Sequence, residues 1–155
     1  MTTKTEKFVS EIFVALDVTK GSLQELYQTV GQELAGKGMV VPNYGRQLQE
    51  REAGFPTGLV TKFGNVAIPH TDPKYVKKPF VYAIRLTDEV ITRRMDQPET
   101  EIPVKLLFVL GFTKSEDQLV LLTKMMQALN NEGISKQFQQ VDSPEQFKAV
   151  LQQQL

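Results

Sequence analysis

The stretch that decides the fold is residues 64–72, which read GNVAIPHTD. The apolar residues 66–68 are typical of a short strand, and this strand runs directly into Pro69 and then His70. Because proline has no amide hydrogen and biases Ile68 toward an extended backbone, the hydrogen-bonded ladder should end at this point. The sequence therefore predicts that His70 lies at the rim of a sheet, where ligands and partner proteins arrive.

The sequence on both sides of this stretch alternates between strand-like and helix-like patterns. Runs rich in apolar, β-branched and aromatic residues predict strands at residues 8–18, 59–63, 65–68, 80–86, 90–94 and 104–112. Apolar residues at helical spacing predict helices at residues 22–36, 44–52, 115–129, 134–141 and 143–151. The expected fold class is α/β, a single-domain sandwich in which helices flank a central sheet of about four to six strands. The pattern does not fix the order of the strands.

Three of the predicted helices begin at a serine. Ser22 is followed three residues later by Glu25, and Ser115 is followed in the same way by Gln118, so each pair forms a capping-box pattern. Ser143 precedes a proline at the first helical position, which is a further N-terminal signal. We therefore expect these serine side chains to cap their helices.

The composition limits the possible classes of function. The 155 residues fit one domain, 1–155, and the 18 basic and 18 acidic residues leave no net charge to attract nucleic acid. The chain has no cysteine, which excludes disulfides and thiolate-bound metals, and it offers one histidine to any catalytic triad or metal site. No apolar run has the length of a membrane span or the form of a signal peptide. We expect a cytoplasmic protein with no cofactor, no metal and no direct membrane insertion.

His70 is the main candidate for chemistry. A neutral imidazole is a competent nucleophile toward phosphorus, and an unperturbed pKa of about 6.5 leaves much of it uncharged at cytosolic pH. Judged alone, however, a histidine after a proline is more often an ordinary surface or hydrogen-bonded residue. The residues considered so far leave both interpretations open.

Further motifs bear on this choice. An Arg-Glu pair at residues 51–52 is followed by a turn and by Ala-Ile-Pro-His at 67–70, and then by the apolar run 103–112 and a helix start at 117–122. In this order, and over nearly the whole chain, the sequence resembles the enzyme IIA domains of the fructose–mannitol superfamily of the bacterial sugar phosphotransferase system (PTS), also called EIIA type 2. Residues 51–58 are similar to the galactitol-type branch in particular.

The resemblance implies a mixed sheet flanked by helices and a phosphoryl carrier function. The family's histidine, here His70, accepts a phosphoryl group from the histidine-containing phosphocarrier protein HPr and passes it to a cysteine of a IIB component. A membrane IIC component then imports the sugar or polyol. The matching arginine is Arg51, whose planar guanidinium can hold phosphoryl oxygens in a loose transition state. Without the resemblance, Arg51 is typical of a solvated residue at a helix end.

Three more residues are candidates with an alternative reading. Many relatives have a second histidine where this chain has Gln118, which could position the phosphoryl group or His70, or serve only in the capping box. Thr57 could donate to a phosphoryl oxygen or bond its own backbone. Asp72 could orient the imidazole, although Asp72 before Pro73 is also typical of a helix N-cap.

Other functions are compatible with a phosphorylated or catalytic histidine. The principal alternative is a regulatory domain whose phosphohistidine controls an enzyme or a transcription factor; the galactitol-like segment favours transport. A hydrolase with His70 as general base is disfavoured because the sequence has no nucleophile-elbow pattern, and a structural protein would not be phosphorylated by the general carriers.

We expect partners to dock on an apolar patch around Pro69 and His70 that includes Phe55 and Phe80, although both phenylalanines could instead be core residues.

Overall fold

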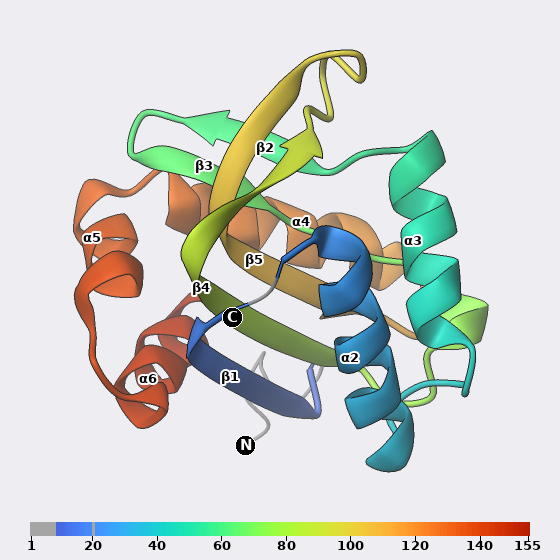
Figure 1. Cartoon of the computed structure of the whole chain (residues 1–155). Helices are drawn as coiled ribbons and strands as arrows, with labels where there is room; N and C mark the ends of the chain where they lie inside the picture. Colours follow the sequence, from blue (N-terminus) through green and yellow to red (C-terminus); the bar gives the residue numbers. More distant parts are fainter. Residues whose placement is uncertain (1–8, 20) are drawn as a thin grey trace.

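A computed structural model describes residues 9–19 and 21–155, and within them it shows a five-stranded sheet with helices on both faces (Figure 1). The strands are β1 Glu11–Val18, β2 Gly58–Thr61, β3 Gly64–Ala67, β4 Phe80–Arg93 and β5 Glu101–Gly111. The α-helices are α2 Leu23–Gly36, α3 Tyr44–Gly54, α4 Ser115–Leu129, α5 Glu132–Gln140 and α6 Pro144–Gln154, and a short 3-10 helix, η1, spans Pro73–Tyr75. Helices α2 and α3 pack on one face, and α4, α5 and α6 on the other. The predicted α/β sandwich is confirmed.

The sheet is mixed, with the strand order β1-β4-β5-β3-β2. β1 runs parallel to β4 and β3 parallel to β5, whereas β4 and β5 pair antiparallel, as do β2 and β3. A hydrophobic core lies on each face of the sheet, and alternate residues of β4 contribute to one or the other. Tyr82 and Ile84 pack with α2 and α3, while Val81 and Ala83 pack with α4, α5 and α6. Because the central strands are covered on both faces, their sequences are almost continuously apolar.

The segments 80–86 and 90–94, predicted as separate strands, form the single strand β4. The register of its pairing with β5 shifts between Arg85 and Val90, and regular pairing resumes at Val90. Such an irregularity bends a strand without ending it, so the polar residues between the two apolar runs do not form a connecting loop.

Two of the three predicted serine caps are present. The Ser22 hydroxyl accepts from the Glu25 amide at 3.2 Å, and the Ser143 hydroxyl accepts from the Gln146 amide at 3.1 Å. The prediction for Ser115 is wrong, because the extended residue before α4 is Lys114 and Ser115 is already the first helical residue. A serine inside the first turn cannot act as an N-cap.

No helix in the described ranges has the length and apolar character that crossing a membrane requires.

Phe80 is a core residue, so its predicted place on a docking surface is wrong. It is the first residue of the inner strand β4 and is fully buried, and it meets Tyr44 edge to face with 6.1 Å between ring centroids. Its ring fills the space above Gly111, where an added Cβ would lie 2.1 Å from Phe80 Cε1. Phe55, in contrast, is 65% exposed and remains available to a partner.

Candidate functional site

His70 is placed by the main chain that follows β3. The regular pairing of β3 with β5 ends at Ala67, as the proline predicts, but the two segments meet once more where His70 bridges Leu110. There the Leu110 amide donates to the Pro69 carbonyl at 2.9 Å. The histidine is therefore attached to the central strand β5. It is only 6% exposed, so it lies beneath the rim rather than on an open surface.

The surroundings of the imidazole select its charge and its tautomer. Nδ1 lies 2.8 Å from the Ile68 carbonyl oxygen, and the ring packs against Phe112 with 5.6 Å between centroids. Because a carbonyl oxygen can only accept, Nδ1 carries the hydrogen and the neutral ring has its lone pair on Nε2. Burial lowers the pKa of His70 below its usual 6.5, with a smaller lowering from the Arg51 charge, while the bond to Ile68 opposes both. The ring is accordingly neutral near pH 7.

Arg51 lies in the last turn of α3, beside a hollow of about 260 Å³. Its guanidinium carbon is 4.5 Å from the centre of the Phe55 ring, and its Nε is buried without a hydrogen-bond partner among the described residues. The hollow also reaches Thr71 and Asp72, the two residues that follow His70. Since buried donors are nearly always satisfied, a buried arginine donor without a partner makes this hollow a candidate anion site.

Thr57 is buried and does not bond its own backbone. Its hydroxyl donates to Glu52 Oε1 at 2.5 Å and its amide donates to Glu52 Oε2 at 3.3 Å. The contact between Glu52 and Thr57 was not predicted from the sequence. A signal was available, because Glu52 continues the four-residue spacing of Tyr44 and Leu48 on the buried face of α3, where an apolar residue is expected.

The other two candidates lie apart from these contacts. Asp72 acts as the N-cap of η1, with its Oδ1 accepting from the Lys74 amide at 3.1 Å, so the capping interpretation is the one that the structure supports. Gln118 lies near the start of α4 and is partly exposed. Within the described part of the chain, no hydrogen bond joins its side chain to His70 or Arg51.

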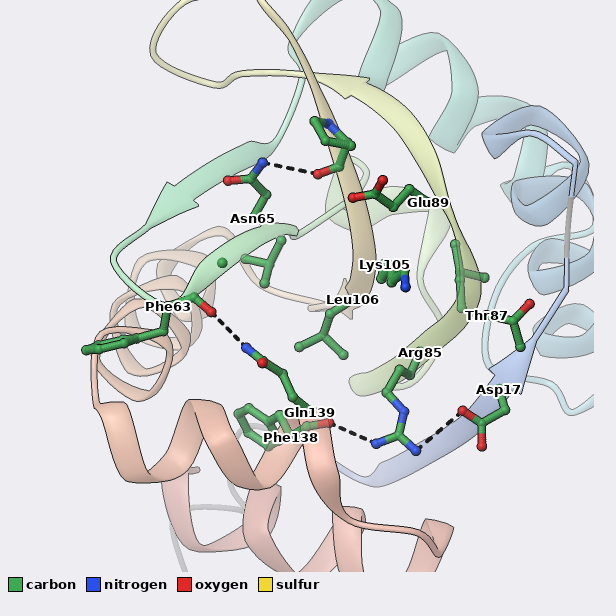
Figure 2. A pocket seen from close by; sticks show the side chains of 14 residues that line it. Asp17, Phe63, Asn65, Arg85, Thr87, Glu89, Lys105, Leu106, Phe138 and Gln139 are labelled. Atoms are coloured by element: carbon green, nitrogen blue, oxygen red, sulfur yellow. Dashed lines mark hydrogen bonds and ion pairs between the residues drawn. The ribbon is translucent and has the colours of Figure 1, made fainter.

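A larger hollow, of about 620 Å³, lies where β3, β4, β5 and α5 meet (Figure 2). Its polar side chains are largely bonded to the protein itself. The Asn65 side-chain amide donates to the Pro103 carbonyl at 3.1 Å, and the Gln139 amide donates to the Phe63 carbonyl at 2.8 Å. These bonds occupy donors that a ligand would otherwise use.

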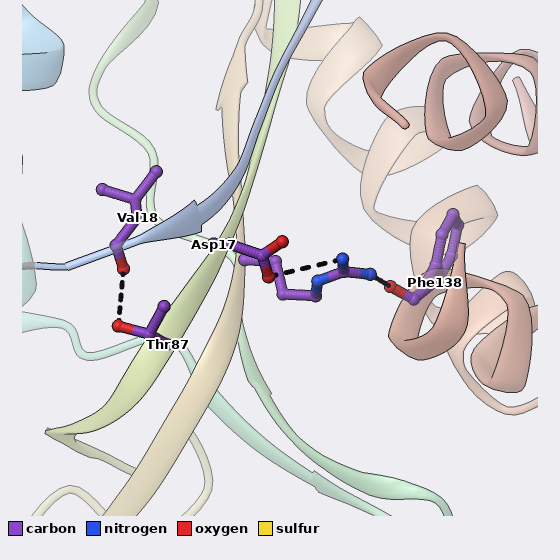
Figure 3. Close-up of polar contacts among 5 residues, drawn as sticks. Asp17, Val18, Thr87 and Phe138 are labelled. Carbon is purple, nitrogen blue, oxygen red and sulfur yellow. Dashed lines mark hydrogen bonds and ion pairs between the residues drawn. The ribbon is translucent and has the colours of Figure 1, made fainter. Parts of the chain in front are cut away.

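The arginine of the larger hollow is Arg85, whose side chain is 13% exposed. It donates to the Phe138 carbonyl at 3.2 Å and to Asp17 Oδ1 at 3.5 Å (Figure 3). Phe138 lies in the last turn of α5, where carbonyls have no partner within the helix. Arg85 therefore satisfies a helix end, which is a structural role.

Comparisons with known proteins identify the family and the fold. Residues 7–154 match the family described as phosphoenolpyruvate-dependent sugar phosphotransferase system, EIIA 2. The galactitol-specific EIIA component of the PTS of Escherichia coli (strain K12) is 29% identical over 114 residues, which cover 74% of this chain and 75% of that relative. The crystal structure of mannitol IIA from Escherichia coli superposes with a TM-score of 0.69 at 22% identity, covering 90% of this chain and 94% of that one.

A further structure is the complex of mannitol enzyme IIA with phosphorylated enzyme IIB from Escherichia coli. It has a TM-score of 0.69 at 20% identity and covers 91% of this chain and 93% of that chain. At these identities the structures establish a common fold, and the family match covers nearly the whole sequence. The chain therefore belongs to the EIIA 2 family of the phosphoenolpyruvate-dependent sugar phosphotransferase system and is a phosphotransfer protein.

Proposed function

We propose that His70 receives and hands on the phosphoryl group through its Nε2 atom. The observation that carries this proposal is the bond from Nδ1 to the Ile68 carbonyl, which leaves the lone pair on Nε2. Burial supports the same role, because it lowers the pKa of His70 and keeps the nucleophile unprotonated.

The reaction needs no proton transfer at His70. The Nε2 lone pair forms a bond to phosphorus while the nitrogen–phosphorus bond of the donor phosphohistidine breaks, and the donor ring keeps the electron pair. The His70 ring gains positive charge, which the Ile68 carbonyl stabilises through Nδ1–H. In the second transfer a thiolate attacks phosphorus and the bond to Nε2 breaks.

Arg51 is proposed to bind the oxygens of the phosphoryl group during both transfers. The Phe55 ring covers the guanidinium, and the buried Nε has no partner among the described residues. A phosphoryl oxygen would satisfy this donor, and a second N–H of the planar fork could bind a neighbouring oxygen. Gln118 and Thr57 are proposed to position these groups rather than to react.

We propose HPr as the donor and a IIB component as the acceptor. We also propose that the protein acts in the cytoplasm and forms a single domain, residues 1–155. The support for IIB is the mannitol IIA–IIB complex, whose IIA subunit shares this fold. The support for a galactitol-type substrate is the 29% identical galactitol-specific relative. A regulatory recipient for the phosphoryl group is the alternative, and this relative favours transport over it.

The direct test is phosphorylation in vitro with phosphoenolpyruvate, enzyme I and HPr. Because the chain has a single histidine, intact mass should rise by one phosphoryl group, and the His70→Ala variant should show no increase. The label should be lost in acid, as expected for a phosphorus–nitrogen bond. A folded His70→Ala variant that still accepts the group would refute the assignment.

The substrate class needs a separate experiment. The phosphorylated protein can be mixed with galactitol-type and mannitol-type IIB components under the same conditions. We expect faster transfer to the galactitol-type component. Equal rates would remove the support for galactitol, and transfer to neither would favour the regulatory alternative.

A further inference from the structure

Glu52 is a nearly buried carboxyl group, 7% exposed, that the proposed reaction does not use. Burial raises its pKa to about 7, although the bonds from Thr57 and the charges of Arg93 and Arg51 act in the opposite direction. Removing a carboxylate from water is costly unless its oxygens are hydrogen-bonded. Both Glu52 oxygens are bonded, and both bonds come from Thr57.

Thr57 continues this connection toward the histidine. Its carbonyl oxygen accepts from the Ile68 amide at 3.3 Å, and the Ile68 carbonyl in turn accepts from His70 Nδ1 at 2.8 Å. Three successive contacts therefore join Glu52 to the imidazole. The last of them is the bond that determines the tautomer of His70.

The other end of this connection is fixed to the helix that carries Arg51. Glu52 is the next residue of α3, and Arg93 of β4 donates to the carbonyls of Glu52 and Ala53. Since adjacent residues of a helix point about 100° apart, Arg51 can face the hollow while Glu52 faces Thr57. The end of α3 thus holds the guanidinium and the support of the histidine together.

We propose that Glu52 is a positioning residue that, through Thr57 and the main chain of Ile68, holds the His70 ring in place relative to Arg51. The inference rests on the proposed role of His70 and Arg51 in phosphoryl transfer. A nucleophile and the group that binds the transition state must keep their relative positions closely, because a misplacement of about 1 Å can lower the rate on the order of 100-fold. A carboxyl group whose two oxygens both accept bonds from Thr57 can supply this rigidity.

The test combines a rate with a measurement on the free protein. Glu52→Gln keeps the size of the side chain and leaves a single acceptor oxygen, while Thr57→Val keeps the shape of the threonine and removes the hydroxyl. For both variants we expect the rate of transfer from phospho-HPr at saturation to fall about 10- to 100-fold with little change in KM. The ¹⁵N signals of the His70 ring should also shift, and with one histidine in the chain they are unambiguous.

Two controls separate positioning from a loss of folding. Thr57→Ser keeps the hydroxyl that Thr57→Val removes, so its transfer rate and ring signals should stay close to those of the original chain. Glu132→Gln removes a carboxylate from an exposed ion pair with Lys136 on α5 and should change neither. Thr57→Val provides an independent test in case Glu52→Gln does not fold. Since both variants break the same connection, the double variant should be no slower than the slower single variant.

The outcomes are distinct from those that test the function itself. Folded variants of Glu52 and Thr57 with unchanged ring signals would overturn the proposal, whatever their transfer rates. Additive effects in the double variant would also overturn it. If the unmodified protein accepted no phosphoryl group, the function assigned to His70 would fail, whereas the ring signals would still test whether Glu52 positions the imidazole.

Discussion

Two hollows of this protein, of about 620 Å³ and about 260 Å³, are each lined by an arginine, and the two arginines differ in how they are bonded. Arg85 borders the larger hollow and is held by the Phe138 carbonyl and Asp17. Arg51 borders the smaller hollow and keeps a buried Nε without a partner in the described chain. The arginine of the larger hollow is thus the one whose donors bond to the protein itself.

The proposal for Arg51 therefore rests on unmet bonding capacity and not on the volume of the hollow. A buried donor without a partner costs about 1–3 kcal/mol, so a fold that retains one needs a reason to do so. The proposed binding of a phosphoryl oxygen would be such a reason for Arg51. Arg85 has its partners already, and its substitution should affect the fold rather than the chemistry.

The largest effect is expected for Arg51→Lys. Lysine keeps the charge but loses the planar fork, so the rate of phosphoryl transfer from phospho-HPr should fall on the order of 100-fold, as for other preorganised donors to a transition state. The free energy of unfolding should change little. A transfer rate like that of the original chain, in a folded variant, would return Arg51 to the status of a surface residue.

The converse result is expected for Arg85→Lys. The orphaned carbonyl at the end of α5 and the lost contact with Asp17 should lower the free energy of unfolding by about 1–3 kcal/mol. The transfer rate of the folded protein should stay the same. Denaturant unfolding and the HPr assay measure the two quantities, and a strong loss of transfer would assign chemistry to the larger hollow.

The two arginines should also differ in their influence on the pKa of His70. Arg51→Met removes a positive charge that lowers this pKa, so the pKa should rise, whereas Arg85→Met should leave it unchanged. Titration of the His70 ring by NMR measures both. A rise in the Arg85 variant alone would contradict the arrangement described above.

Stability should follow the same titration. The folded state has the lower His70 pKa, so the unfolded chain binds more protons as pH falls below 6.5. The contribution of His70 to stability is therefore full above that value and is lost as pH falls through the folded pKa. In Arg51→Met the two pKa values lie closer, and this loss on acidification should be smaller.

The smallest effect is expected for Gln118→Ala. The side chain makes no bond to His70 or Arg51 in the described chain, and the helix start it was expected to cap uses no side-chain bond. We expect the transfer rate to fall by about tenfold or less, which corresponds to one modest hydrogen bond formed only with the phosphoryl group. Stability should be unaffected. A decrease as large as that of Arg51→Lys would make Gln118 a principal ligand.

The sequence predicted those parts of the fold and site that local physics controls. The end of β3 before Pro69 follows from the missing proline amide, and the caps at Ser22 and Ser143 follow from their neighbours. The central apolar strand was predicted because burial on both faces imposes its composition.

The remaining features depend on contacts between distant segments. The burial of Phe80 follows from its place above Gly111, which strand pairing alone reveals. The sequence did not predict the role of Glu52, because its partner Thr57 belongs to the turn beyond the helix. His70 was expected on an open rim, but the bridge to Leu110 draws it inward.

The contact between Phe80 and Gly111 has a consequence for how this sequence can evolve. Any side chain at position 111 would collide with the ring, and the neighbouring Leu110 is the residue that His70 bridges. Substitution at 111 should therefore be accepted only together with a smaller residue at 80. Among homologues, the two positions should covary, and a lineage that enlarges one without reducing the other should lose the register that holds its histidine.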